Sequence, residues 1–299
     1  MPKQIVEINT NNYSLNMFRG FLLVKNAGVE VGRVVLEDIV SVVLSAPDAV
    51  ITKNLMSELA HHNIPVVFCN EVYLPTSVAI PLSSHYKSRL VLEHQINAKT
   101  TLKKRLWQST VKEKILNQSK VLQYFYPCCS EHATLKDMAN AVMSGDSTFM
   151  ESQSARLYFS KIFNDDFKRE SESKDILNVA LNYGYIVLRS SAARSLVASG
   201  LNTHLGIFHK NNYNPFCLAD DIMEIYRPLV DFTVKNMNLN GVDILTPQIK
   251  QELAKIIHLD VLHNGENVPI YNVFNYIAQS LVSSFKMNDN LLNFGTIKI

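Results

Sequence analysis

This chain of 299 residues has few cysteines and almost no tryptophan, with four of the first and one of the second. Its formal net charge is only +2. No two cysteines form a C-x-x-C pair, and the adjacent Cys128 and Cys129 have a poor spacing for zinc. We therefore interpret the cysteines as reduced thiols of a cytoplasmic protein, without a metal or disulfide role. A net charge so close to zero says little about binding partners.

Membrane spans, leader sequences and repeats are also missing. No apolar run reaches the roughly 18 residues that a spanning helix needs, and no basic and apolar leader opens the chain. No repeat or low-complexity segment is present. Apolar residues make up 47% of the chain and charged residues 19%, a composition typical of a globular protein with a sizeable core. We expect a cytoplasmic protein with no membrane partner.

The distribution of proline and glycine divides the chain into two unlike parts. Before residue 84, short runs rich in Val, Ile and Leu alternate with turn signals, and one amphipathic helix is expected over 52–63. After it, long stretches lack both residues and favour helices. We predict an α+β protein, with a small β-rich N-terminal domain (1–83) and a larger all-α C-terminal domain (84–299). The helices are expected within 85–122, 146–163, 173–200, 216–236, 247–259 and 273–285.

Positive charge is concentrated in one segment of the predicted helical part. Residues 87–120 carry nine basic and two acidic side chains, a net of +7, so the rest of the chain is net acidic. Such a segment can contact DNA phosphates in a largely sequence-independent way, although a solvated basic helix would look the same. The single tryptophan, Trp107, lies in this segment, and we interpret it as a core or interface residue.

Three carboxylates stand in an otherwise apolar run, "LADDIMEIYRP" (218–228). On a helix Glu224 shares a face with Asp221 and with Asp220, which cannot both point the same way. Like charges in a poorly solvated place are costly unless a cation joins them. Pro228 lacks an N–H and leaves the carbonyl of Glu224 without its helical partner, so we expect a bend there. A solvated acidic face is the alternative interpretation.

Two further residues could complete a metal site for phosphate chemistry. His209 closes "GLNTHLGIFH" (200–209), and Glu151 opens "MESQSARLYF" (150–159). Carboxylate oxygens, with one imidazole, are suitable ligands for Mg²⁺ or Mn²⁺. Taken singly, each has an ordinary explanation, His209 as a structural histidine and Glu151 as a charge in a first helical turn.

The order and wording of these stretches, together with "DILNVALNYGYIVLRS" (175–190), resemble the CRISPR-associated spacer-acquisition integrase family, the first-numbered of the CRISPR-associated proteins. The basic stretch at 103–122 is similar to the corresponding stretch of the family members that occur in type II CRISPR systems. The resemblance implies that Glu151, His209 and Glu224 bind a divalent metal, Mg²⁺ or Mn²⁺, with Asp221 as an auxiliary catalytic carboxylate. Asp220 matches no functional position.

The family resemblance implies a metal-dependent DNA integrase and endonuclease. It joins the 3′-hydroxyl ends of short duplex DNA to a repeat array by transesterification. The implied partners are a second copy of the chain, a dimer of the small second CRISPR-associated protein flanked by two integrase dimers, double-stranded or splayed DNA, repeat DNA and the type II effector nuclease. The candidate DNA-binding residues are Lys103, Lys104, Arg105, Lys112, Arg156, Arg189, Lys210 and Arg227.

Two other functions are alternatives to the integrase. A metal-dependent DNA nuclease without an integration role would need the same ligands, because water in place of the DNA hydroxyl makes the reaction a hydrolysis. A non-catalytic DNA-binding scaffold would carry the acidic cluster as mere surface.

Overall fold

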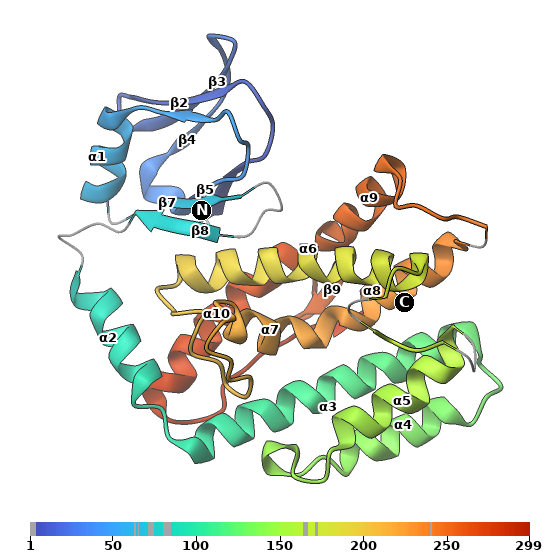
Figure 1. The fold of residues 1–299 in the computed structure, drawn as a ribbon. Helices are drawn as coiled ribbons and strands as arrows, with labels where there is room; N and C mark the ends of the chain where they lie inside the picture. Colours follow the sequence, from blue (N-terminus) through green and yellow to red (C-terminus); the bar gives the residue numbers. More distant parts are fainter. Residues whose placement is uncertain are drawn as a thin grey trace.

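Strands dominate the first part of the chain and helices the rest (Figure 1). The structure, a computed structural model, describes residues 4–62, 64, 66–70, 75–79, 85–163, 167–170, 173–239 and 241–299. The strands of the N-terminal part are β1 (Gln4–Ile8), β2 (Tyr13–Phe18), β3 (Phe21–Asn26), β4 (Val29–Val35), β5 (Ile39–Leu44), β6 (Val50–Ile51), β7 (Val66–Cys69) and β8 (Pro75–Ala79).

These strands form two four-stranded sheets, ordered β1-β5-β7-β8 and β4-β3-β2-β6. In the first sheet β1, β5 and β7 run parallel and β8 is antiparallel. The helix α1 (Lys53–His61) begins as expected at Thr52, whose hydroxyl accepts a hydrogen bond from the Leu55 amide. Leu55 and Leu59 of α1 are buried in the core of this domain, with Leu15 and Val42 from the two sheets.

The helical part begins with α2 (His85–Ile96), the long α3 (Thr100–Phe125) and α4 (Glu131–Asn140). It continues through α5 (Met150–Ile162), α6 (Ile176–Ala198), α7 (Cys217–Met223), α8 (Arg227–Met237), α9 (Pro247–Ala254) and α10 (Ile270–Met287). The expected helices are present, and the structure adds a separate helix, α4, that the sequence analysis did not predict. No helix in the described ranges is both long and apolar enough to span a membrane.

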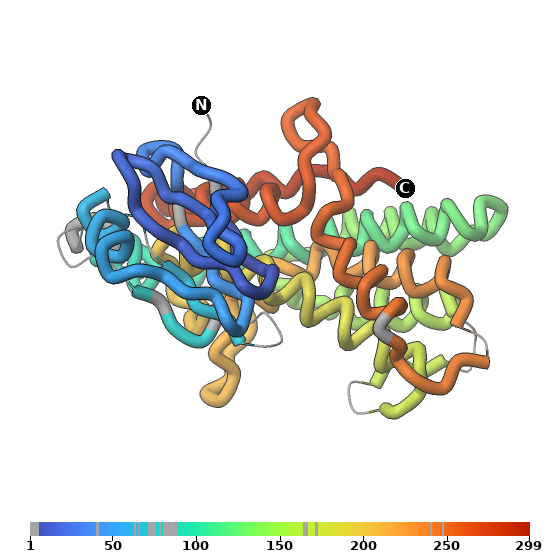
Figure 2. Tube along the Cα trace, turned by 90° about the horizontal axis from the view of Figure 1, so that it is seen from above, coloured from blue at the N-terminus to red at the C-terminus, as the bar shows by residue number. Residues whose placement is uncertain are grey.

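The buried helix α6 lies between the two parts of the protein (Figures 1 and 2). One side contacts β5, β7 and β8, and other sides pack on α7, α8 and α10. Close packing against α8 depends on Gly184, because a Cβ there would lie 2.4 Å from Cγ1 of Val230. An ion pair also joins the two parts, with Arg194 Nη1 of α6 3.2 Å from Glu7 Oε1 of β1.

The helical part is not all-α, which corrects the prediction in detail while leaving the α+β class confirmed. It contains a small sheet ordered β10-β9-β11, formed by β9 (Asp260–His263), β10 (Glu266–Pro269) and β11 (Thr296–Ile297). Asn264 and Gly265 connect the first two strands, both with positive φ. An Asn-Gly pair of this kind is a strong hairpin signal.

The expected boundary between residues 83 and 84 lies outside the described residues.

Candidate metal and DNA site

The acidic stretch at 218–228 does not form one continuous α-helix. Helix α7 ends at Met223, a 3-10 turn (η4, Glu224–Tyr226) follows, and α8 begins at Arg227. The carbonyl of Glu224 accepts the Arg227 amide, in place of the missing N–H of Pro228. The carbonyl of Ile225 accepts a hydrogen bond of 2.9 Å from Asn117 Nδ2 of α3. The expected break at the proline is therefore present, and α3 anchors it.

Lys114 of α3 joins the two predicted carboxylate ligands. Its Nζ lies 2.6 Å from Oε1 of Glu151 and 2.5 Å from Oε2 of Glu224. The other oxygen of Glu224 lies 2.5 Å from Nη1 of Arg227. The Lys114 and Glu224 side chains are 8% and 5% exposed, whereas Glu151 is 25% exposed. Glu151 and Glu224 are thus brought together around one cationic atom, at the edge of solvent.

The charges in this cluster stabilise one another. Burial by itself would raise the pKa of the Glu224 carboxyl, but the Arg227 guanidinium and the Lys114 ammonium hold that pKa well below its ordinary value. Burial opposes the charge of Lys114 too, yet Glu224 and Glu151 raise the pKa of its ammonium. The Glu224 carboxylate and both cations therefore remain charged near neutral pH.

A strained turn positions Glu151 at the start of α5. Asp146 accepts hydrogen bonds from the amides of Met150 and Glu151, at 2.8 and 3.2 Å. Asp146 and Phe149 both have positive φ, a conformation that is uncommon for residues other than glycine. The Asp146 carboxylate thus satisfies two of the free amides at the start of α5. This carboxylate fixes the first turn from which the Glu151 side chain projects.

Asp221 organises the loop that carries His209. Its buried carboxylate accepts the amides of Ile207, Phe208 and His209, at 2.5, 3.0 and 3.1 Å. Nδ1 of His209 lies 2.7 Å from Oδ1 of the same group. Because the carboxylate only accepts hydrogen bonds, Nδ1 carries the proton, and the Nε2 lone pair of a neutral ring is left for a ligand.

The position of His209 also depends on Gly206. A Cβ at Gly206 would lie 2.3 Å from the His209 carbonyl oxygen and 2.9 Å from Oδ2 of Asp221. Only glycine allows the loop to fold back so closely on the carboxylate. The hydrogen bond with Asp221 raises the pKa of the His209 imidazole against the effect of its burial, and the charges of Asp221, Glu224 and Glu151 act in the same direction. The His209 ring therefore lies close enough to Glu151 and Glu224 to feel the charge of both carboxylates.

An aromatic stack supports the other side of the His209 loop. The rings of Trp107 and Phe208 are parallel within 2°, with centroids 4.3 Å apart. The His209 ring meets Trp107 edge-on at 5.6 Å. Trp107 is buried, as expected for a core residue, whereas Phe208 is half exposed. The loop is thus fixed by a carboxylate on one side and by an indole ring on the other.

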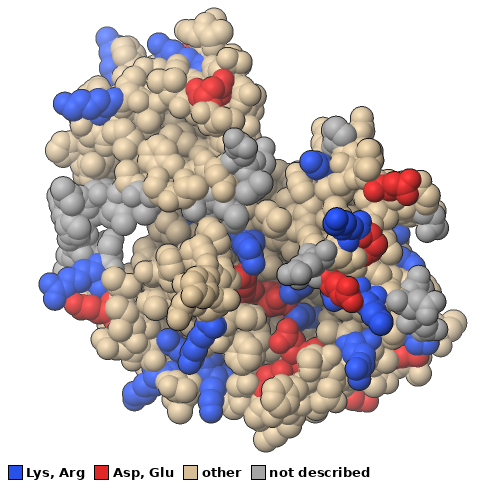
Figure 3. All heavy atoms as spheres, viewed as in Figure 1, with Lys and Arg blue, Asp and Glu red and all other residues tan. Residues whose placement is uncertain are grey.

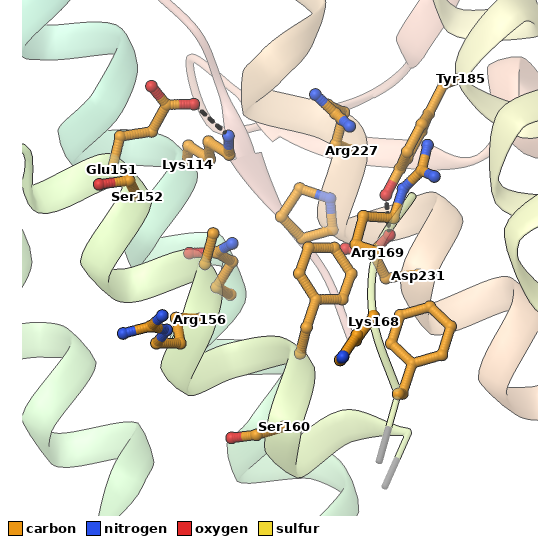
Figure 4. A pocket seen from close by; sticks show the side chains of 15 residues that line it. Lys114, Glu151, Ser152, Arg156, Ser160, Lys168, Arg169, Tyr185, Arg227 and Asp231 are labelled. Atoms are coloured by element: carbon orange, nitrogen blue, oxygen red, sulfur yellow. Dashed lines mark hydrogen bonds and ion pairs between the residues drawn. The ribbon is translucent and has the colours of Figure 1, made fainter. Parts of the chain in front are cut away.

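A cavity of about 530 Å³ opens beside the carboxylate cluster (Figure 4). Lys114 and Glu151 are joined on one side of the view, and Arg169, Arg227 and Tyr185 lie on the other. The Arg227 guanidinium stacks 4.1 Å from the Tyr185 ring centre. Basic side chains predominate in the lining: Lys114, Arg156, Lys168, Arg169 and Arg227, against Glu151 and Asp231. The cavity is therefore suited to an anionic ligand.

Asp231 forms a second buried polar group at the floor of this cavity. The Tyr185 hydroxyl donates a hydrogen bond to its carboxylate. Burial raises the pKa of Asp231 to about 6, although the Tyr185 hydrogen bond and the charge of Arg227 act in the opposite direction. Burial and the charge of Asp231 raise the pKa of the Tyr185 phenol as well. This carboxyl therefore titrates nearer to neutral pH than an ordinary aspartate.

The predicted ligands Glu151, His209 and Glu224 have the oxygen and nitrogen atoms that bind a divalent cation. In the part of the chain that the structure describes, however, no three His, Cys, Asp or Glu side chains lie close enough together to hold a metal ion. The reason is visible in the contacts. Lys114 stands between Glu151 and Glu224, and Nδ1 of His209 faces Asp221. Two carboxylates from separate helices converging on one cation, beside an imidazole, are the donor set that Mg²⁺ or Mn²⁺ accepts.

Asp220 points away from this cluster, as its lack of a family counterpart suggested. It is buried rather than solvated, with Oδ1 2.6 Å from Arg189 Nε and Oδ2 2.7 Å from Asn214 Nδ2. The candidate DNA contact Arg189 is therefore engaged within the protein.

The other candidate DNA-binding residues differ in exposure. Lys103 is half-buried, and burial, together with the charge of Lys210, lowers its pKa. Arg105 pairs with Asp289 at 3.0 Å, and Arg227 holds Glu224. Figure 3 shows Lys and Arg clustered over the start of α3, with Asp and Glu in the hollow at the centre of the same face. The exposed candidates are Lys104, Arg105, Lys112, Arg156 and Lys210.

Lys114 is the residue that sequence reasoning overlooked, since it was counted only within the basic segment. A signal was present. Lys114 lies at helical spacing from Trp107, Val111 and Gln118, which are all buried on one side of α3. A lysine on such a face needs a buried anionic partner. Asp231 and Tyr185 carry no such local signal, because the two residues lie 46 positions apart in the chain, on α6 and α8.

A family model and a curated relative both match most of this chain, and both are of the same protein family. The model of the family described as CRISPR associated protein Cas1 matches residues 6–243. The CRISPR-associated endonuclease Cas1 of Neisseria meningitidis serogroup C (strain 8013) is 38% identical over 253 residues, which cover 84% of this chain and 82% of that protein.

Solved structures share the fold over nearly the whole chain. A partial Cas6-RT-Cas1–Cas2 complex has a matching chain with a TM-score of 0.80 and 17% identity, covering 99% of this chain and all of that one. A casposase bound to an integration product has a TM-score of 0.74 and 19% identity, with the same coverage. At these identities the likeness concerns the fold alone.

Proposed function

The chain belongs to the Cas1 family of CRISPR-associated proteins, and on that premise we propose that it is a metal-dependent DNA integrase of CRISPR adaptation. One observation carries the proposal. Glu151 and Glu224, from separate elements, converge within 2.6 Å of one cationic atom beside the fixed ring of His209.

Glu151, Glu224 and Nε2 of His209 would hold Mg²⁺ or Mn²⁺. Such an ion polarises a phosphate oxygen and lowers the pKa of a bound hydroxyl. Asp221 acts through His209, because it keeps the proton on Nδ1 and orients the ring. It is therefore a positioning residue, with no free oxygen directed at a ligand. Arg227 holds Glu224 ionised from the opposite side.

The proposed reaction is a transesterification. The 3′-hydroxyl oxygen of a short duplex attacks a phosphodiester of the repeat, forming one P–O bond. A second P–O bond breaks, and the displaced strand leaves with a new 3′-hydroxyl that takes up the proton. One phosphodiester replaces another, so no high-energy cofactor is required. The integration product bound to the related casposase supports this choice over hydrolysis alone.

The basic side chains around the site would hold the DNA. Arg156 and Lys168 line the cavity beside Glu151, and the exposed lysines of α3 continue the positive surface. Phosphate contacts of this kind bind double-stranded or splayed DNA and repeat DNA without reading sequence. We propose a homodimer as the working unit, two of which flank a dimer of Cas2, and the type II effector nuclease as a further partner. The Cas1–Cas2 complex with the shared fold supports the Cas2 assignment.

A strand-transfer assay tests the function. A short duplex with free 3′ ends is incubated with a repeat-containing plasmid, Cas2 and Mg²⁺ or Mn²⁺. We expect joined products from the wild-type protein and none from Glu151→Gln. Cleavage without joining would instead support a nuclease that lacks an integration role. Equal acquisition by Glu151→Ala, His209→Ala and wild type in cells would support a non-catalytic scaffold.

A further inference from the structure

Lys114 occupies the place that a metal ion needs. Its ammonium nitrogen lies 2.6 Å from Glu151 and 2.5 Å from Glu224, and its side chain is 8% exposed. The second oxygen of Glu224 is taken by Arg227 at 2.5 Å. An ion ligated by both carboxylates cannot share this space with an ammonium, since two cations in contact in a buried site repel strongly.

We propose that Lys114 is a built-in counter-cation, which holds Glu151 and Glu224 together in the metal-free protein and is displaced when a divalent metal binds. This inference rests on the proposed metal site and adds a regulatory residue to it. The lysine keeps the carboxylates of Glu151 and Glu224 from repelling each other when no metal is present. It also weakens metal binding, because the ion must first remove it.

The cavity beside the cluster gives the displaced ammonium a destination. Lys114 itself lines this space of about 530 Å³, and its flexible four-carbon stem can turn without movement of α3. The same space is lined by Arg156, Lys168, Arg169 and Arg227, and by Asp231, whose carboxylate already accepts a hydrogen bond from the Tyr185 hydroxyl. An ammonium that moves there enters basic surroundings and requires an anion as partner. A DNA phosphodiester is the anion that this site is proposed to bind.

Charge balance connects the two binding events. In the metal-free protein Glu151 and Glu224 are matched by Lys114 and Arg227, so the cluster is neutral. When a divalent ion binds and Lys114 moves into the cavity, the site has two more positive charges than negative ones. A bound phosphate reduces this excess. DNA therefore strengthens metal binding, and by linkage the metal strengthens DNA binding to the same extent. Lys114 makes the site bind its metal firmly only when the DNA is in place.

Direct metal binding tests the inference without reference to catalysis. Mn²⁺ affinity is measured for the DNA-free protein by the EPR signal of the unbound ion. We expect Lys114→Met to bind Mn²⁺ about tenfold more tightly than wild type, a factor within the usual range of coupling between sites. Its melting temperature in EDTA should fall, and Mn²⁺ should raise it by more than in wild type. Lys136→Met, at an exposed lysine of α4, is the matched control and should match wild type.

A second measurement uses the wild-type protein, in case Lys114→Met does not fold. Reductive methylation followed by mass spectrometry reports how accessible each lysine amine is. With EDTA the Lys114 amine should react slowly, and saturating Mg²⁺ should increase its methylation several-fold. Lys136, in the same sample, should be unaffected.

The outcomes separate this inference from the proposed function. If Mn²⁺ binds wild type but not Glu151→Gln, while Lys114→Met binds no more tightly than wild type, the counter-cation role is overturned and the metal site stands. Unchanged methylation of Lys114 with saturating Mg²⁺ would overturn it equally. If Glu151→Gln binds Mn²⁺ as well as wild type does, both proposals fail.

Discussion

Nδ1 of His209 lies 2.7 Å from Oδ1 of Asp221, and this one carboxylate also accepts the three amides of residues 207–209. The conformation of the histidine loop therefore depends on a side chain that is fully buried in α7. Asp221 and Glu224 are near neighbours in the chain, yet they serve different purposes: Glu224 faces cations, whereas Asp221 faces donors.

Asp221→Ala should lower the free energy of unfolding by about 3 kcal/mol, because one buried and three partly buried donors lose their acceptor at once. Urea denaturation measures the change. Asp243→Ala, at an exposed position, should stay within about 0.5 kcal/mol of wild type. A loss no larger than that of the control would show that the loop does not depend on Asp221.

Gly206→Ala should displace His209. The added methyl would lie 2.3 Å from the His209 carbonyl oxygen, so the loop must move. We expect strand transfer to fall by about a hundredfold, the cost of misplacing a reacting group by about 1 Å. Gly32→Ala is the control, since nothing lies within 4 Å of a Cβ there. Equal activity of the two variants would contradict the prediction.

Glu151→Gln and Glu224→Gln should both lower strand transfer by more than about a hundredfold, since even the outer partners of metal ligands contribute ten- to a hundredfold. Their stabilities should differ. Glu224 is 5% exposed and pairs with two cations, so its removal leaves buried charge unpaired and costs about 3–5 kcal/mol. Glu151 is 25% exposed, so its loss should cost about 1 kcal/mol or less. Thermal unfolding in EDTA distinguishes them, and equal losses would refute this division.

Asp231 should make stability depend on pH. Its pKa is raised from 3.8 to about 6 in the folded chain. A carboxyl with a raised pKa stabilises the fold when protonated, so its contribution is complete below pH 3.8 and is lost as the pH rises through about 6. The free energy of unfolding should fall across this window by about 3 kcal/mol more in wild type than in Asp231→Asn. Parallel pH profiles would rule this out.

Asp220→Ala should be more costly than an ordinary surface change. From sequence a mild effect is expected, but Asp220 is buried between Arg189 and Asn214. We now expect a loss of about 1–3 kcal/mol in unfolding free energy, with strand transfer by the folded protein retained. Denaturation and the transfer assay measure the two effects separately. A loss of transfer equal to that of Glu224→Gln would mean that the carboxylate assignments are shifted.

Much of the architecture follows from local sequence. Runs of Val and Ile broken by turn residues predict the N-terminal strands, and Thr52 marks the start of α1. The break after Glu224 follows from Pro228, which cannot donate a hydrogen bond. These features depend on residues close together in the chain. The hairpin at Asn264-Gly265 is equally local, because an Asn-Gly pair readily adopts the positive φ that both residues have.

The sequence by itself determined the family, the α+β class and the identity of the acidic and imidazole groups, because residue types in a fixed order carry that information. Only the tertiary structure decided how those groups are used. It set Lys114 of α3 between Glu151 and Glu224, and it turned Asp221 toward the amides of another loop. These partners lie far apart in the chain, and burial makes their charges dependent on one another.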